Sequence, residues 1–233
     1  MIKSAHGGRK EEMLKIVVFD SGYGGEFFAD RLSEELPIVD VIRVIDWRNA
    51  EPLTKKDKEA RRIIEDDLKP YLGKVDLIVF ANYYLSATSL DYFKRKYRKQ
   101  QFIGLDFKEP DTFVKRDVLV LATNPVIKTL RYQMFLLKLK RKNITLALDS
   151  WPAKIDDGEL TGNEIKETLM RELSGYKSIP QEVILANAQF SDIKKELKKT
   201  LGRYIKIYDG FDSTIREINK TLKIRGGLRK LKM

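Results

Sequence analysis

Two segments about 105 residues apart repeat one another, and this repeat constrains the fold more than any other feature of the chain. In each segment an apolar run of strand length ends at Ala-Asn, at Asn82 in one and at Asn187 in the other. A serine follows four residues later in both, at Ser86 and Ser191. A period of this length predicts two similar units built by internal duplication.

The repeat extends to two further pairs of apolar runs, at nearly the same spacing. The corresponding strand ends are Asp20 with Thr123, Asp46 with Asp149, and Asn82 with Asn187. Because ligands of open α/β sheets bind outside the carboxyl ends of the strands, we expect these residues to meet in a cleft between the halves.

Strand-length apolar runs alternate with longer amphipathic segments, a pattern typical of parallel α/β units. The predicted strands are Leu14–Phe19, Val41–Ile45, Leu77–Phe80, Phe102–Leu105, Val118–Ala122, Ile144–Leu148, Val183–Leu185 and Tyr204–Ile207. The segments with helical spacing are Lys56–Leu72, Pro125–Lys138 (with Thr123-Asn124 as its N-cap), Gly162–Leu173 and Ser191–Leu201. We therefore predict an α/β protein of two doubly wound, flavodoxin-like parallel-sheet domains, related by pseudo-two-fold symmetry and separated by a cleft.

Composition narrows the available chemistry. The 233 residues contain no cysteine and a single histidine, His6, so disulfides, zinc–thiolate sites, thiol nucleophiles and imidazole bases are excluded or nearly so. Any catalysis must use carboxylates, lysines, tyrosines or hydroxyls. No apolar run is long enough to span a membrane, and residues 1–13 are expected to form a flexible leader without the apolar core of a signal peptide.

The net charge of +11 raises the alternative of nucleic-acid binding. The basic clusters are Lys94 to Lys99, Lys138 to Lys142, Lys194 to Lys199, and a tail from Lys223 to Lys232. Charge runs on helices are usually solvated faces, so this remains an alternative. The high Lys and Glu content without cysteine suits a cytoplasmic protein of a thermophile.

Several motifs, in the right order over roughly residues 14 to 218, resemble the aspartate/glutamate racemase family. The segment Phe19-Asp-Ser-Gly-Tyr-Gly-Gly25 is similar to the family's opening loop Phe-Asp-Ser-Gly-Val-Gly-Gly. The stretches from Ile78 to Thr88 and from Leu185 to Ser191 resemble its two cysteine loops, Ala-Cys-Asn-Thr and Gly-Cys-Thr-His-Tyr. Leu121-Ala-Thr and Asp209-Gly210 resemble two further family segments.

The resemblance implies a cofactor-independent racemisation in which two cysteines flank the substrate α-carbon, and it implies a homodimer. Asparagines, Asn82 and Asn187, occupy both cysteine positions here. A carboxamide does not exchange a proton near neutral pH, so the family's two-thiol route is not expected. We expect no cofactor and no metal.

Neighbouring positions that hold substrate in the family also differ. Tyr83 and Tyr84 replace the Asn and Thr after the first cysteine, and Ala188 and Gln189 replace the Thr and His after the second. Pro52 begins what remains of the family's Pro-Tyr-Gly loop. Together with Asp20, Ser21, Thr123 and the two asparagines, these residues form the predicted ligand site.

Other roles remain open for several of these residues. Asp20 and Ser21 either hold a ligand or cap the helix that follows. Asp46, Asp149 and Asp156 either provide acid–base chemistry across the cleft or cap and solvate loops. The aromatic residues beside them, Trp47, Trp151, Tyr83 and Tyr84, either stack on a planar ligand or pack the domain junction.

Three hypotheses follow from these observations. The first is a non-racemising family member, a pseudoenzyme, that binds a small carboxylate, an amino-acid-like ligand or a partner in the cleft. The second is an isomerase or lyase that uses carboxylates, and the third is a protein that binds nucleic acid. The expected domains are residues 14–112 with 208–222, and residues 113–207, followed by a basic tail over 223–233.

Overall fold

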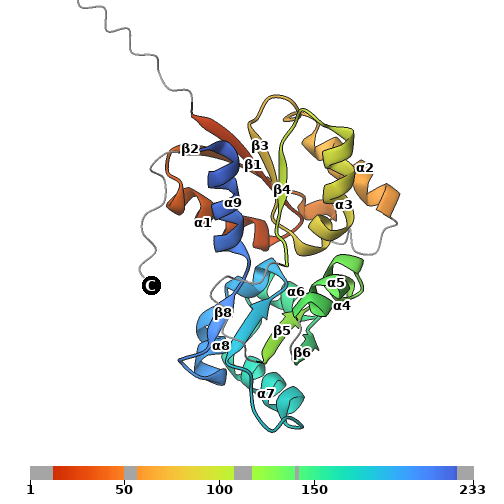
Figure 1. The fold of residues 1–233 in the computed structure, drawn as a ribbon. Helices are drawn as coiled ribbons and strands as arrows, with labels where there is room; N and C mark the ends of the chain where they lie inside the picture. Colours follow the sequence, from red (N-terminus) through yellow and green to blue (C-terminus); the bar gives the residue numbers. More distant parts are fainter. Residues whose placement is uncertain (1–12, 50–56, 108–116, 140–141, 225–233) are drawn as a thin grey trace, which may run out of the picture.

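The computed structural model describes residues 13–49, 57–107, 117–139 and 142–224, which fold into two stacked α/β halves (Figure 1). The first half holds a four-stranded parallel sheet of order β2-β1-β3-β4. Its elements are β1 (Leu14–Asp20), α1 (Tyr23–Glu35), β2 (Val39–Ile45), η1 (Trp47–Asn49), α2 (Asp57–Leu68), β3 (Leu77–Phe80), α3 (Tyr83–Lys96) and β4 (Phe102–Gly104).

The second half repeats this topology with a parallel sheet of order β6-β5-β7-β8. Its elements are β5 (Val118–Ala122), α4 (Asn124–Ile127), α5 (Leu130–Leu139), β6 (Asn143–Ala147), α6 (Trp151–Asp156), α7 (Gly162–Leu173), β7 (Glu182–Leu185), η3 (Ala188–Ser191), α8 (Lys194–Leu201) and β8 (Lys206–Tyr208). The matching strand orders confirm the predicted pair of doubly wound domains.

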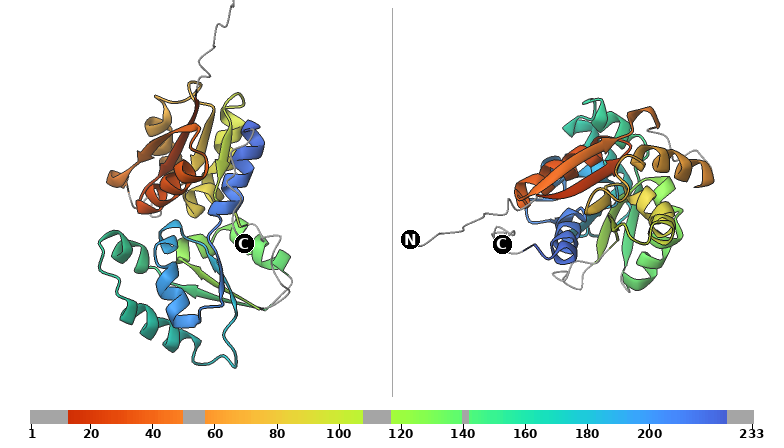
Figure 2. Two further views of the ribbon diagram at one scale, coloured as in Figure 1. Left: turned by 90° about the vertical axis from the view of Figure 1, so that its left-hand side faces the viewer. Right: turned by 90° about the horizontal axis from the view of Figure 1, so that it is seen from above.

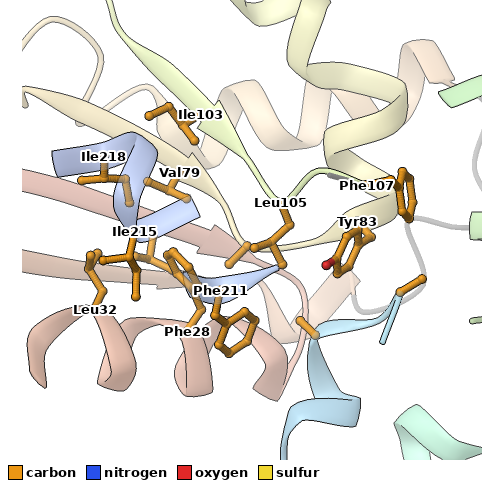
Figure 3. Packing of buried hydrophobic residues seen from close by; sticks show 14 of the residues in the cluster. Phe28, Leu32, Val79, Tyr83, Ile103, Leu105, Phe107, Phe211, Ile215 and Ile218 are labelled. Atoms are coloured by element: carbon orange, nitrogen blue, oxygen red, sulfur yellow. The ribbon is translucent and has the colours of Figure 1, made fainter. Parts of the chain in front are cut away.

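The chain then returns to the first half through α9 (Phe211–Leu222), which lies beside α1 and the first sheet in both views of Figure 2. Phe211 meets Phe28 edge to face with ring centroids 5.1 Å apart, and Ile215 and Ile218 extend the contact (Figure 3). Gly210 makes the crossing in a left-handed conformation, with φ of 76°, that suits glycine.

One hydrophobic core runs through both halves. It combines one face of the first sheet, including Val18 and Val79, with one face of the second, including Val120 and Ile184. The opposite face of each sheet packs against its own helices in a separate cluster. Alternate side chains of each central strand therefore enter different cores, which explains why these strands are apolar throughout.

The predicted strands all form, with ends that differ by no more than two residues. The predicted helix Pro125–Lys138 is instead two helices, α4 and α5, separated at Lys128 and Thr129. Thr129 explains the break, because its hydroxyl donates to Val126 O (2.7 Å) and accepts from Tyr132 N (3.3 Å). The segment Ser191–Leu201 is likewise divided between the end of η3 and α8.

Candidate functional site

The carboxyl ends of the central strands of both sheets face the junction between the halves. The loop after β1 and the loop after β7 touch there. A Cβ atom added to Gly24 would lie 2.5 Å from Ala188 Cβ, and one added to Gly22 would lie 2.8 Å from Gln189 Nε2. Glycine in this turn is thus required by close approach between the two halves.

Asp20, at the end of β1, is the most unusual group at this junction. Its side chain is 1% exposed. Oδ1 accepts from Ser21 N (2.6 Å) and from Asn82 Nδ2 (2.8 Å), whereas Oδ2 is buried without a hydrogen-bond partner. Burial raises the pKa of Asp20 from 3.8 to about 7, and the hydrogen bonds from Asn82 and Ser21 only partly oppose that rise.

Asp156, the last residue of α6, brings a second carboxyl to the same loop from the other half. Its Oδ2 would lie 3.2 Å from a Cβ added to Gly22 and accepts from Gln189 Nε2 at 3.4 Å. Its Oδ1 is buried without a partner. Burial raises the pKa of Asp156 to about 6, and its charge contributes to the raised pKa of Asp20. The junction therefore holds two interacting carboxyls that titrate near neutrality.

Both repeated asparagines act as helix caps. Asn82 Oδ1 accepts from Leu85 N (3.0 Å) at the start of α3, and Asn187 Oδ1 accepts from Gln189 N (2.9 Å) at the start of η3. Asn82 additionally donates its amide to Asp20. A strand that ends in asparagine and leads directly into a helix explains why the motif occurs twice.

The residues after the asparagines pack the junction. Tyr83 is 3% exposed, stacks on Phe107 with centroids 5.0 Å apart, and donates its hydroxyl to Asp209 O at 2.8 Å (Figure 3). Ala188 is buried against Gly24. Tyr84 is partly buried between two of the cores. Tyr83 therefore closes the junction and leaves no ring face free there for a ligand.

The sequence left open a carboxylate pair across the cleft, formed by Asp46 and Asp149, and the structure places each of them in contact with groups of its own half. Asp46 lies 3.7 Å from Arg48 Nε and interacts with Asp67, a residue of α2. Asp149 is exposed and accepts from Asn124 N at 2.7 Å, so it caps α4. Each aspartate therefore interacts with residues of its own half. These partners are either close in the sequence or on the adjoining helix, and they determine where the carboxylate points.

The starts of two helices, α1 and α4, differ in how they are capped. The N-cap residue of α1 is Gly22, which has no side chain to cap the helix. Thr123 is the N-cap residue of α4 and is buried, but its side chain makes no capping hydrogen bond. Asp149 supplies that hydrogen bond instead.

The two tryptophans occupy different environments. Trp47 is 45% exposed and meets Tyr23 edge to face at 4.5 Å, whereas Trp151 is buried against Phe190 in the core of the second half. Ser21 is buried beside Asp20, and Pro52 lies outside the described residues. Of the residues singled out from the sequence, Asp20, Asn82, Asp156 and Gln189 lie together at the junction.

Two acidic residues were not assigned a role from the sequence. Asp67 has a pKa raised to about 6 by burial and by the neighbouring Asp46. Asp209 is buried where the chain crosses back, and accepts from Ser191 Oγ (3.0 Å), Phe211 N (3.1 Å) and Lys194 Nζ. The sequence gives no reason to single out Asp67, because it is one of many charged residues in its helix. Asp209 could have been singled out, because the segment Asp209-Gly210 resembles a family motif.

The described residues contain no group of three or more acidic or histidine side chains placed to hold a metal ion. In the same part of the chain, no helix is both long and apolar enough to cross a bilayer. Some lysines of the basic clusters are bound to carboxylates, since Lys96 pairs with Glu65 at 2.6 Å and Lys194 with Asp209.

Comparisons with known proteins agree with the fold and the motifs. The chain is 25% identical over 216 residues to a glutamate racemase from Clostridium novyi, covering 90% of this chain and 83% of the relative. It is 24% identical over 223 residues to one from Aquifex aeolicus, with coverage of 91% and 85%. No protein-family model matches it.

Among solved structures, the glutamate racemase of Escherichia coli, in complex with L-glutamate and the activator UDP-MurNAc-Ala, has a TM-score of 0.78 at 20% identity. The likeness covers 91% of this chain and 84% of that one. These likenesses support common ancestry and the fold, and they give no support to the nucleic-acid alternative.

Proposed function

We propose that this homologue of the aspartate/glutamate racemase family binds a small amino-acid-like ligand between its halves and does not racemise it by the two-thiol route. One observation carries the proposal: Asp20 presents a buried, unpartnered Oδ2 at the strand ends where the halves meet. A buried acceptor without a donor is costly, and a ligand amino group would satisfy it.

The absence of thiol chemistry is supported by the residues at the two family cysteine positions. The chain has no cysteine, and Asn82 and Asn187 use their side-chain oxygens to cap helices. A carboxamide held in this way cannot remove an α-proton near neutral pH. Tyr83 and Ala188 change the surroundings as well, because they pack the junction.

A second candidate function is acid–base catalysis by carboxyls, as in an isomerase or lyase. The observation that favours it is the pair Asp20 and Asp156, which come from opposite halves with pKa values raised to about 7 and about 6. Groups that titrate near the working pH are the most effective proton carriers. In this candidate, Asp20 and Asp156 would exchange protons with a ligand bound between them.

Exchange of α-protons in heavy water, followed by ¹H NMR, tests the function. We expect no exchange with the L or D forms of glutamate and aspartate, and none in the double variant Asn82→Cys/Asn187→Cys, because the neighbouring residues still differ. Exchange by the wild-type protein that Asn82→Ala abolishes would contradict the proposal. Exchange that Asp20→Asn abolishes would establish the acid–base alternative.

Three further expectations accompany the proposal. Residues 14–112 with 208–222, and residues 113–207, are proposed as the two domains, supported by the packing of α9 against α1. A homodimer and a cytoplasmic location are proposed from the family resemblance. Size-exclusion chromatography with light scattering tests the dimer.

A further inference from the structure

We propose that the exposed apolar face of α5, together with the groove between α5 and α3, is the surface through which two copies of this chain pair about a two-fold axis. This surface rests on the homodimer proposed above, for which it names the face that becomes buried. It is independent of what binds between the halves.

Three large apolar side chains of α5 are exposed to solvent. Leu130 and Leu137 are 76% and 80% exposed, and Met134 between them is also exposed. Their spacing of four and three residues places them along one stripe of the helix. The other face of α5 is buried in the core that both halves share. A contiguous exposed stripe of this kind indicates contact with another protein surface.

The stripe borders a groove between α5, in the second half, and α3, in the first (Figure 1). The groove has a volume of about 430 Å³, and its walls include Leu130, Met134, Ala87 of α3 and Phe107 after β4. An apolar anchor from a partner that fills such a groove would contact both halves at once. Leu137 of a second copy can supply that anchor, because it projects furthest into solvent among the large apolar side chains of the described residues.

Charged side chains lie at opposite ends of the stripe. At its first end, Arg131 lies 3.3 Å from Asp91 of α3 and 3.7 Å from Asp106, so two carboxylates share one guanidinium. At its other end, Lys138 is exposed and forms no ion pair with any residue that the structure describes. One end of the stripe is therefore acidic and the other is basic.

This surface complements itself when two α5 helices cross antiparallel. A two-fold axis beside Met134 brings Leu130 of each copy against Leu137 of the other. The same arrangement places Lys138 of each copy near Asp91 and its neighbouring carboxylate in the other copy. A parallel pairing would instead set the two lysines against each other, so charge favours the antiparallel one.

The charge of the groove also favours this face over the rest of the surface. At a net charge of +11, two copies of the chain repel one another at long range. The described charged residues that line the groove are two acids and two bases, Asp91, Asp106, Arg131 and Lys138. Self-association is therefore least opposed where the local charge is balanced.

Sedimentation equilibrium of the full chain tests the surface. We expect a dimer that Leu137→Glu weakens at least ~100-fold, because a two-fold interface contains each substitution twice. Tyr204→Glu is the matched control, because Tyr204 is similarly exposed and lies outside α5 and the groove. Circular dichroism and melting temperature establish that each variant is folded.

A charge exchange tests the antiparallel geometry. Lys138→Glu and Asp91→Lys should each weaken the dimer at least ~10-fold, and the double variant should recover most of the loss. Lys166→Glu, at an exposed lysine of α7, is the control for net charge and should leave the dimer unchanged.

Cross-linking gives an independent readout, because the chain has no cysteine. Met134→Cys places a single thiol beside the axis and should form a disulfide-linked dimer under mild oxidation, as seen on a non-reducing gel. Tyr204→Cys should remain uncross-linked.

The two proposals fail in different ways. A monomer at every concentration would overturn both the homodimer and this surface. A dimer that neither Leu137→Glu nor Lys138→Glu weakens, and that Met134→Cys does not cross-link, would overturn this surface and leave the homodimer standing.

Discussion

The two halves share a strand-end motif but use it for different purposes. In the first half Asn82 caps a helix of 14 residues and also holds the buried carboxyl of Asp20. In the second half Asn187 caps only the short η3, and the strand end that corresponds to Asp20 is Thr123. The second carboxyl, Asp156, comes from α6 instead. The two halves therefore match in where their strands end, and they differ in the residues placed at those ends.

The residue after each asparagine shows the same asymmetry. Tyr83 reaches across the junction to the backbone of Asp209, whereas Ala188 is small enough for Gly24 to approach closely. The first half therefore fills the junction with the large side chain of Tyr83, whereas the second half has a small residue, Ala188, that leaves room for the backbone at Gly24.

Truncation of Tyr83 should have the largest effect on stability. Tyr83→Ala removes a buried ring and its hydrogen bond to Asp209 O, and is expected to lower the free energy of unfolding by about 3–5 kcal/mol. Tyr83→Phe should cost only about 1 kcal/mol. Urea denaturation measures both. Tyr176→Ala, at a tyrosine that is 49% exposed, is the control, and an equal loss there would refute the role of Tyr83.

The pH dependence of the free energy of unfolding should distinguish the contribution of Asp20 from that of carboxyls at the surface. Because its folded pKa is raised from 3.8 to about 7, the stability that Asp20 contributes is fully present below the lower value and is lost as pH rises through the upper one. The loss amounts to at most about 4 kcal/mol. Asp20→Asn should remove this part of the decline in a series of urea titrations. Wild type and variant with parallel pH profiles would contradict the assignment.

The two asparagines should differ when each is replaced by alanine. Asn82→Ala loses both a cap and the hydrogen bond to Asp20, an expected cost of about 2–3 kcal/mol. Asn187→Ala loses only a cap, at about 1 kcal/mol. Chemical denaturation of both variants under one condition gives the difference. Equal losses would mean that Asn82 does not support Asp20.

A methyl group on Gly24 tests the contact between the halves. Gly24→Ala places its Cβ 2.5 Å from Ala188 Cβ, so the loops must separate, and about 1–3 kcal/mol should be lost. Gly175→Ala is the matched control, because no atom lies within 4 Å of its Cβ position. A tolerated Gly24→Ala, judged by melting temperature, would show that the halves do not meet closely there.

The sequence predicted the fold because the fold depends on chain-wide patterns. The strand runs, their period and the ordered motifs placed all eight described strands within two residues. The break in the helix at Thr129 was missed, because a threonine hydroxyl that turns back on the backbone leaves no mark in hydrophobic spacing.

Side-chain direction limited what could be predicted about the site. Asp46 and Asp149 end corresponding strands, yet Arg48 and Asp67 hold one and Asn124 holds the other. Trp47 and Trp151 also correspond in sequence, but one is exposed and the other buried. In Asp20, Oδ1 accepts hydrogen bonds whereas Oδ2 has no hydrogen-bond partner. This arrangement depends on packing between the halves, which the spacing of residues in the sequence does not reveal.

The carbon-13 chemical shift of the Asp20 carboxyl, followed through a pH titration by NMR, tests the central claim most directly. Asp20→Asn provides the assignment. The buried and unpartnered state predicts a pKa of about 7, well above 3.8, and a lower value when an amine binds. A pKa near 3.8 in the free protein would mean that Asp20 is solvated or paired, and the proposed recognition of an amine between the halves would fail.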